Sequence, residues 1–306
     1  MFRFILRRLL ETIPVLWAVA TLTFIMLRMA PGGPFDAERQ VTPEVLEQLN
    51  AQYGLDQSLP RQYATQLWNL ARGDLGVSFK YPNRTVNEVI AETFPISLEL
   101  GVYAILIALV IGMITGLVAS LRPNTMTDYV PSALAMVGIC LPTFVLGPLL
   151  ILLFVIKLGW LPMSGWTSIP SAKILPALTL GLYFAAYVSR LTRGGMREIL
   201  TQDYIRTARA KGASETRVIL KHALRGGILP VVSFLGPAVA GLIAGSFVIE
   251  TIFNIPGLGK FFVTSAFNRD YTMVLGLVVF FASLIVFFNL VVDILQIWLN
   301  PRLKYE

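Results

Sequence analysis

Long apolar runs separated by shorter polar segments dominate the chain. The first run extends from Leu9 to about Leu27. Five more follow: Pro95–Leu121, Val130–Ile156, Ile174–Leu191, Ile228–Ile249 and Thr272–Leu299. Each is near or above the length of about 20 residues that a helix needs to cross the hydrocarbon core of a bilayer. The pattern therefore predicts an all-α polytopic membrane protein with six transmembrane helices.

The first apolar run follows a basic start, as the apolar part of a secretory signal peptide does. It is longer than the roughly 7–15 residues of a cleavable segment, and no small-x-small cleavage site follows it. We therefore expect a first transmembrane helix within residues 1–30. Arg28 would lie at its outer end, where a long side chain can reach polar surroundings.

Helix-breaking residues interrupt two of the spans. Pro142 and Pro148 predict a kink in the third span, and Gly236–Pro237 predicts a bend in the fifth. The fifth span also contains Gly241 and Gly245, a G-x-x-x-G pair that lets another helix approach closely. That helix could belong to this chain or to a partner subunit.

Composition agrees with a membrane protein, since 55% of the residues are apolar, only 14% are charged, and the mean hydropathy is +0.68. The net charge of +7 is distributed asymmetrically. Placing the N-terminus inside gives the cytoplasm the basic residues near the start, Arg122, those from Arg190 to Arg225, and those near the end. We therefore expect a multi-pass membrane protein with both termini in the cytoplasm, and no nucleic-acid partner.

The segment 31–94 is too long to be a plain connector and should have a structure of its own. Pro43–Tyr53 and Pro60–Arg72 each begin with a proline, which suits the first turn of a helix, and both carry spaced apolar residues. They predict two short amphipathic helices on the outer surface.

The stretch Asp203–Arg225 is the most basic in the chain. Two acidic residues, Asp203 and Glu215, stand against six cations: Arg206, Arg209, Lys211, Arg217, Lys221 and Arg225. Residues on both sides of Gly212 favour helix, and glycine alone enters left-handed conformations without steric cost. We expect two short helices that meet at a sharp corner, the second with a narrow apolar face of Val218, Ile219 and Ala223. The simplest alternative is a basic loop that only sets topology.

This stretch resembles the cytoplasmic coupling loop of ABC importer permeases, whose motif is Glu-Ala-Ala, three residues, Gly, nine residues, Ile-x-Leu-Pro. Aligned on Gly212, the chain has Arg206-Thr207-Ala208 for the triplet and His222, Leu224 and Arg225 for Ile, Leu and Pro. RTARAKG followed by HALR resembles the peptide-importing branch closely. In that family the loop docks into a groove on the ATPase. The resemblance implies these contact residues: Tyr204, Arg206, Thr207, Ala208, Arg209, Ala210, Lys211, Gly212, Ala213, His222 and Leu224. Arg206 in place of glutamate puts that one contact in question.

The resemblance covers essentially the whole chain. FPISLELG (94–101), ETIFNIPGLGKFF (250–262) and NRDYTMVLG (268–276) are similar to the B-type permease subunit of oligopeptide and dipeptide importers. It implies the type I ABC importer permease fold, with segments 1–30, 31–94 and a five-helix core 95–306 that includes a coupling loop 192–227. The function it implies is oligopeptide import, with dipeptides or another small solute such as nickel as the alternative.

The same resemblance implies a location in the bacterial inner membrane and a set of partners. They are a second permease subunit forming a heterodimer, two cytoplasmic ATPase subunits, an extracytoplasmic peptide-binding protein, the lipid bilayer and the peptide substrate. The chain itself would bind no cofactor, because ATP and magnesium would reside on the ATPase subunits. No phosphate-binding loop is present, since the nearest candidate, Gly257-Leu258-Gly259-Lys260, lacks the following hydroxyl residue. We therefore expect neither catalytic nor metal-binding residues, and His222 is expected to be a polar surface residue.

Two other functional classes fit less well. A proton-coupled transporter needs ionisable residues inside its spans, but Glu99, Glu250 and Asp293 lie near span ends. An intramembrane hydrolase needs a nucleophile paired with a base at mid-membrane depth, and the single histidine, His222, lies in a polar loop.

The fifth span and its continuation are our candidate for an outer gate. The glycines lack side chains and leave the helix narrow and able to bend. Glu250 lies where the helix reaches the outer interface. Ile255-Pro-Gly-Leu-Gly predicts a tight turn in which a glycine takes the reversed dihedral. The candidate gate or pore residues are Gly236, Pro237, Gly241, Gly245, Glu250, Pro256 and Gly257.

Overall fold

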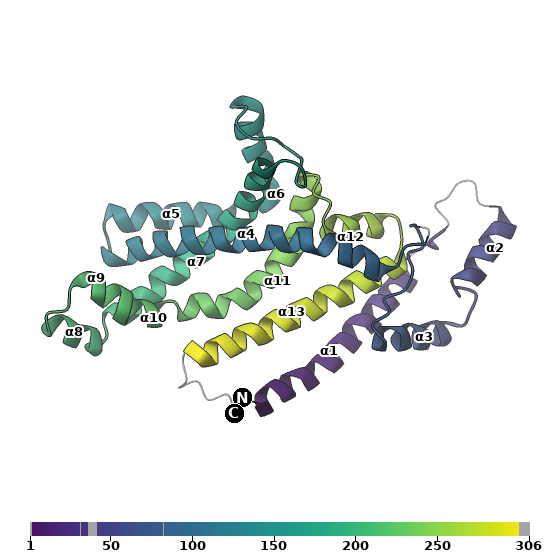
Figure 1. Cartoon of the computed structure of the whole chain (residues 1–306), viewed down its shortest axis with the longest axis horizontal. Coiled ribbons are helices and arrows are strands. Elements are labelled where there is room, and N and C mark those ends of the chain that lie inside the picture. The colour runs from purple at the N-terminus through teal and green to yellow at the C-terminus, as the bar shows by residue number, and fades with distance from the viewer. Residues whose placement is uncertain (1, 31, 36–41, 82, 300–306) are drawn as a thin grey trace. The chain divides into compact units, whose positions relative to one another are not determined.

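The computed structural model describes residues 2–30, 32–35, 42–81 and 83–299, and it is built from helices (Figure 1). In chain order these are α1 Phe2–Met29, α2 Pro43–Gln52, α3 Leu59–Ala71, α4 Val86–Leu121, α5 Met126–Cys140, α6 Thr143–Leu150, η1 Ile151–Lys157, η2 Pro170–Lys173, α7 Ile174–Leu200, α8 Asp203–Ala210, α9 Glu215–Arg217, η3 Val218–Ala223, α10 Leu224–Gly227, α11 Leu229–Ile252, α12 Leu258–Phe267 and α13 Tyr271–Leu299. Within the described ranges, the only strand-like pairing is one antiparallel bridge between Val77 and Thr85. The predicted all-α fold is confirmed.

Four helical stretches are long and apolar enough to cross a membrane: Leu6–Met29, Val86–Leu121, Pro170–Leu200 and Tyr271–Ile297. Two bent helix pairs pass the same test, Met126–Cys140 with Thr143–Lys157 and Glu215–Gly227 with Leu229–Leu242. The described part of the chain therefore contains six spans if each bent pair is one span, as the apolar pattern predicts.

The two bends differ in how well the sequence locates them. The third span turns by 106° between α5 and α6, directly before Pro142, so the predicted kink is confirmed. The fifth turns by 46° at Ile228, whereas α11 continues through Pro237 without a break. The bend expected at Gly236–Pro237 stays a prediction. Pro230 explains the bend at Ile228, because a proline in the first turn begins a new helix where its missing N–H is not needed.

Two helices also extend beyond the predicted spans. α4 begins at Val86, ahead of Pro95, because Thr85 and Glu88 form a reciprocal cap. The Thr85 hydroxyl accepts the Glu88 N–H at 3.2 Å, and the Glu88 carboxylate accepts the Thr85 N–H at 3.0 Å. α7 runs to Leu200, so the predicted loop 192–227 begins as the last turns of this helix.

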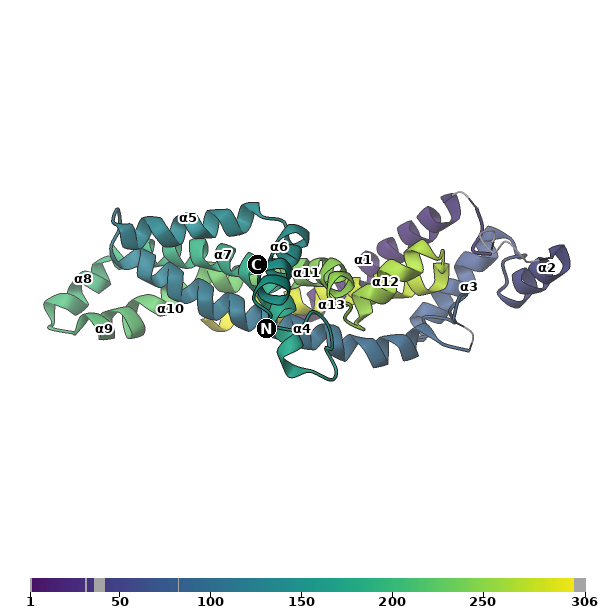
Figure 2. The ribbon, with the colours of Figure 1, turned by 90° about the horizontal axis from the view of Figure 1, so that it is seen from above.

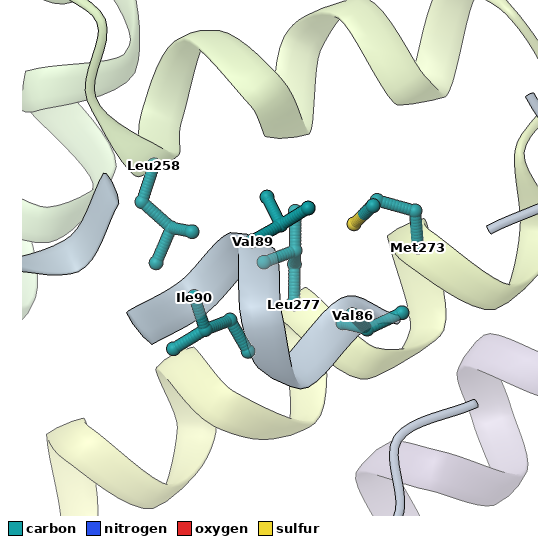
Figure 3. Packing of buried hydrophobic residues seen from close by; sticks show 6 residues of the cluster. All are labelled: Val86, Val89, Ile90, Leu258, Met273 and Leu277. Atoms are coloured by element: carbon teal, nitrogen blue, oxygen red, sulfur yellow. The ribbon is translucent and has the colours of Figure 1, made fainter. Parts of the chain in front are cut away.

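The chain divides into two compact units, Met1–Ile96 with Pro256–Phe287 and Ser97–Ile255 with Phe288–Glu306. The core of the first unit is a cluster of apolar side chains from three helices (Figure 3). Its buried members are Val86, Val89, Ile90, Leu258, Met273 and Leu277. Because these residues come from the start of α4, α12 and α13, the cluster joins segments far apart in the sequence.

The two predicted amphipathic helices of segment 31–94 are present as α2 and α3, and each has a proline in its first turn. α3 is fixed to α1 by Tyr63. The Tyr63 hydroxyl lies 2.7 Å from the Thr21 hydroxyl, and its ring centroid lies 5.4 Å from that of Phe24. α3 is therefore packed on α1.

Asp270, fully buried at the start of α13, holds the stretch that precedes α4. Its carboxylate accepts a hydrogen bond from the Ser78 hydroxyl, from the Phe79 N–H at 3.1 Å and from the Met273 N–H at 3.2 Å. The last contact caps α13, and the first two bind residues about 190 positions away in sequence. The buried Asp270 carboxylate thus joins the stretch before α4 to the start of α13.

The second unit is organised around α7, which packs against α5, α6 and α11 and against α4. Gly112 and Gly116 of α4 allow close approach, since a Cβ on Gly116 would lie 2.4 Å from the Ser189 carbonyl oxygen of α7. α5 is joined to α7 by an ion pair between buried Asp128 and Arg193, with N–O distances of 2.5 and 2.8 Å. The ion pair fixes α7 to α5, and the glycine contacts fix it to α4.

We predict that Asp270→Ala loosens the segment before α4. The change leaves the Ser78 hydroxyl and two backbone N–H groups without their acceptor, which costs roughly 1–3 kcal/mol for each buried group left unsatisfied. Limited proteolysis of the purified full chain should show faster cleavage within residues 42–81. Asp56→Ala, at an exposed position, is the matched control. Equal cleavage rates for both variants would contradict the assignment.

Candidate functional site

The stretch 203–227, here called the basic module, forms two helical arms joined at Gly212 (Figure 2). α8 ends at Ala210, and α9 begins at Glu215 and continues into η3 and α10. Gly212 has a φ of +77°, in the left-handed region. The predicted corner is confirmed.

Apolar side chains attach the basic module to α7. Four residues with no exposed surface form the contact: Met196 of α7, Ile205 of α8, and Val218 and Ala223 of η3. Ile199 and Leu200 of α7 and Leu117 of α4 pack around them. The predicted apolar face of the second arm is confirmed, since Val218 and Ala223 are buried and Ile219 lies at the edge of the cluster.

The opposite surface of the basic module is cationic. All six basic side chains are exposed, and so are both acidic ones. Arg209 reaches across the corner to Glu215, with N–O distances of 2.8 and 3.3 Å, which links the two arms. Arg206 lies 3.4 Å from Asp203 within α8. The remaining four cations give the surface a positive charge suited to an acidic partner.

The structure brings the predicted contact residues together on this module. Seven are exposed: Tyr204, Arg206, Thr207, Arg209, Ala210, Lys211 and Gly212. Four are half-buried: Ala208, Ala213, His222 and Leu224. Three of them, Ala208, Ala213 and Leu224, pack against the buried cluster. The exposed residues are therefore available to a partner, while the half-buried ones pack beneath them.

A groove of about 480 Å³ opens on the same unit, between α6, α7 and α11. Its walls are aromatic and apolar: Pro142, Thr143, Phe144, Leu180, Tyr183, Phe184, Tyr187, Phe234, Pro237 and Gly241. The Tyr187 ring stacks on Phe234 with centroids 5.5 Å apart, and the Tyr183 and Tyr187 hydroxyls lie 3.3 Å apart. The groove thus combines flat apolar surfaces with a pair of hydroxyl groups.

Sequence reasoning did not identify this groove. Tyr183 and Tyr187 are four residues apart, which places them on one face of a helix, and this spacing is the signal that was available. The contribution of Phe234 comes from α11 and could not be read from the pattern of α7.

The residues predicted to form a gate fall at several different places. Pro237 and Gly241 line the groove. Gly236 is buried against α13, since a Cβ there would lie 2.5 Å from the Asn289 side-chain oxygen. The surroundings of Gly245 lie outside what the structure describes. Glu250 is fully buried and accepts a hydrogen bond of 2.7 Å from the Ser97 hydroxyl.

The turn after α11 differs from the one we predicted. Pro256 and Gly257 belong to the first compact unit, and Gly257 has an extended φ of −96°. The left-handed residue is Asn254, with a φ of +52°. The expectation that a glycine takes the reversed dihedral is wrong, because asparagine also tolerates this conformation.

α7 carries both the groove and the anchor of the basic module (Figure 1). Tyr187 and Met196 lie on this one continuous helix, roughly 14 Å apart along its axis at 1.5 Å per residue. The basic module and the groove are therefore connected by a single helix. Among the described residues, no three His, Cys, Asp or Glu side chains gather closely enough to hold a metal ion.

Comparisons with protein families give two matches. Residues 93–305 match the family described as "Binding-protein-dependent transport system inner membrane component". Residues 1–101 match the N-terminal region described for the membrane component of the same systems.

Individual relatives match over the full length. The chain is 45% identical over 306 residues to the oligopeptide transport system permease protein OppB of Haemophilus influenzae, and 46% identical to that of Salmonella typhimurium, with 100% of each chain covered. It is 42% identical over 304 residues to the dipeptide transport system permease protein DppB of Bacillus subtilis, covering 99% of this chain and 98% of the relative.

Solved structures with a similar fold include the MetNI methionine ABC transporter in an inward-facing conformation, with a TM-score of 0.59 and 16% identity. That match covers 69% of this chain and 96% of the other. An amino acid ABC transporter matches with a TM-score of 0.50 and 19% identity, covering 71% and 95%. At these identities the likeness concerns the fold.

We predict that Gly212→Val strains the corner, whereas Gly212→Asn preserves it. Nothing lies within 4 Å of a Cβ at this position, so the cost arises from the positive φ alone, about 1–3 kcal/mol for a residue that resists it. Among the described residues, asparagine adopts this region at Asn83, Asn124 and Asn254. Trypsin should cleave the valine variant faster at Arg209 and Lys211. Identical cleavage of the two variants would disprove the conformational role of Gly212.

Proposed function

The chain belongs to the family of inner-membrane components of binding-protein-dependent transport systems, and on that premise we propose that it is the permease subunit of an ATP-driven oligopeptide importer. Membership makes it a multi-pass membrane protein and a non-catalytic subunit of an ABC importer, in which partner subunits hydrolyse ATP. The substrate class, the partner contacts and the orientation in the membrane are the proposed parts.

Oligopeptides are favoured as substrates by the relatives. Identity is 45–46% to the oligopeptide permeases of Haemophilus influenzae and Salmonella typhimurium, and 42% and 38% to the dipeptide permeases of Bacillus subtilis and Lactococcus lactis, all at full length. Dipeptides form the second candidate class, because that difference in identity is small. An aromatic groove supports either class, since stacking surfaces accept side chains of many shapes.

The basic module is the proposed contact with the ATPase subunits. Its exposed cations and its corner at Gly212 form a rigid projection, since its underside is attached to α7 by four buried side chains. A rigid projection can transmit a displacement, whereas a flexible loop would absorb it. This buried attachment is the observation on which the proposal chiefly rests.

Orientation in the membrane follows from this contact. ATPase subunits act in the cytoplasm, so the basic module lies on the cytoplasmic side, in agreement with the excess of lysine and arginine there. Six spans then place both termini in the cytoplasm. Segment 31–94 lies outside the membrane on the opposite face, where a peptide-binding protein would dock.

The groove supports a role as half of the translocation pathway. Its aromatic side chains are open on one side, and a second permease subunit would complete the walls. ATP binding by the ATPases would move the basic module, and α7 would carry the movement to Tyr183 and Tyr187. Transport would then alternate between two states whose populations ATP and loaded binding protein shift. ATP and magnesium would be bound by the partner subunits and not by this chain.

The test is uptake by the reconstituted complex. Proteoliposomes that contain this chain with its second permease and ATPase subunits, supplied with binding protein, should import labelled tri- to pentapeptides only when ATP is inside. Gly212→Val should abolish uptake at normal assembly, and Gly212→Asn should retain most of it. Dipeptides and Ni²⁺ are assayed in parallel. Uptake of either without uptake of longer peptides would overturn the oligopeptide assignment, and normal uptake by the valine variant would overturn the proposed contact.

A further inference from the structure

A second cavity, of about 340 Å³, lies within the first compact unit. It is separate from the aromatic groove in sequence and in residue chemistry. Its walls come from the end of α1, from α2, α3 and their connection, from the stretch before α4, and from the first turn of α13. Amide side chains are frequent among its lining residues, which distinguishes this cavity from the apolar groove.

Arg28 supplies a positive charge to this cavity. Its guanidinium lies 5.4 Å from the ring centroid of Phe24 and 5.7 Å from that of Tyr271. Among the described residues, no carboxylate lies within 4.0 Å of it. A half-buried cation that rests only on aromatic faces is incompletely compensated. The arrangement therefore favours an anion as a ligand, and a carboxylate fits the planar guanidinium with two hydrogen bonds.

Gln62 supplies an acceptor. Its side-chain nitrogen donates to the Leu55 carbonyl at 3.1 Å and to the Gln57 carbonyl at 2.7 Å, which fixes the orientation of the amide. The Gln62 Oε1 atom is then buried and has no hydrogen-bond partner. An unused buried acceptor costs stability unless a ligand donates to it, and a peptide N–H is such a donor.

Asp74 adds a carboxylate to the same wall. Its Oδ1 atom accepts the Gly76 N–H at 2.9 Å, which leaves further acceptor capacity on the group. A site for an anionic lipid headgroup would be weakened by this negative charge. A peptide C-terminus combines an anionic carboxylate with N–H groups, so it can use all three features, namely the cation, the amide acceptor and the carboxylate.

We propose that this cavity binds the C-terminal end of a short peptide, with the terminal carboxylate on Arg28 and a peptide N–H on Gln62. The volume lies at the low end of the about 300–1,000 Å³ typical of small-ligand sites, so the cavity would hold the end of a peptide rather than a long one. The inference rests on the proposed peptide substrate. It gives the segment after the first span a role in receiving peptide from the binding protein.

The experiment measures peptide binding to the purified permease–ATPase complex without binding protein. Labelled trialanine should bind, and its C-terminal amide should bind about tenfold more weakly, because the charge-assisted contact is lost. Arg28→Gln should remove this preference for the free carboxylate. Arg72→Gln is the matched control, because Arg72 also lies over an aromatic ring, 4.4 Å from that of Trp68, but does not line the cavity.

A second variant keeps the test decisive if Arg28→Gln fails to assemble. Gln62→Leu should weaken binding of both the acid and the amide while retaining the preference between them. Equal binding of the acid and the amide by the wild-type complex would overturn the inference. Binding of anionic lipid vesicles at Arg28, without binding of trialanine, would also overturn it. Uptake by the same complex with binding protein separates the two proposals. If peptide uptake is normal but the complex binds trialanine and its amide equally, only the proposed peptide site in this cavity is rejected. If peptide uptake is absent, the proposed transport function is rejected.

Discussion

The contact on which the rest of the functional structure depends is the burial of Met196, Ile205, Val218 and Ala223 beneath the basic module. A stretch with six exposed cations would otherwise be a solvated loop, since like charges repel one another and disfavour a compact form. Burying a large aliphatic side chain contributes roughly 1.5–3 kcal/mol. Burial of these side chains therefore fixes both arms on α7, and the corner at Gly212 sets the angle between them.

The helix beneath this contact is itself held on several sides. Gly112 and Gly116 bring α4 against its backbone, and the ion pair between Asp128 and Arg193 attaches α5 close to the anchor. Movement of the basic module thus reaches three helices at once, and α7 bears the tyrosines of the groove. The first unit follows a different principle, because buried polar contacts of Asp270 join its distant segments. Buried apolar side chains hold the basic module, which is proposed to move. Hydrogen bonds to the buried Asp270 carboxylate hold together the first unit, which is proposed to receive peptide.

Much of this could be predicted because it is encoded locally. The apolar runs predict the spans, the prolines at the start of α2 and α3 predict those helices, and Gly212 predicts the corner. The cap formed by Thr85 and Glu88 and the glycine pair at Gly112 and Gly116 are also encoded locally. Pro95 and the pair of Gly241 and Gly245 are more conspicuous signals in the sequence and point to other positions.

What could not be predicted depends on distant partners. The contact of Ser78 with Asp270 spans 192 positions, and Phe234 meets Tyr187 only after α7 and α11 have packed. Residue type alone predicts a glycine in the left-handed conformation after α11, whereas the structure has Asn254 in that conformation.

The central claim is that the basic module and α7 move as one body. It is tested most directly by spin labels at Arg197 of α7 and Arg206 of α8, two exposed positions, in the assembled complex with exposed Cys140 replaced by serine. Thiol labelling of a cysteine at Phe144, on the groove wall, is followed under the same conditions. The account predicts that the distance between the labels stays constant when ATP is trapped, while labelling at the groove changes. A distance that shifts with ATP while groove labelling stays constant would contradict it.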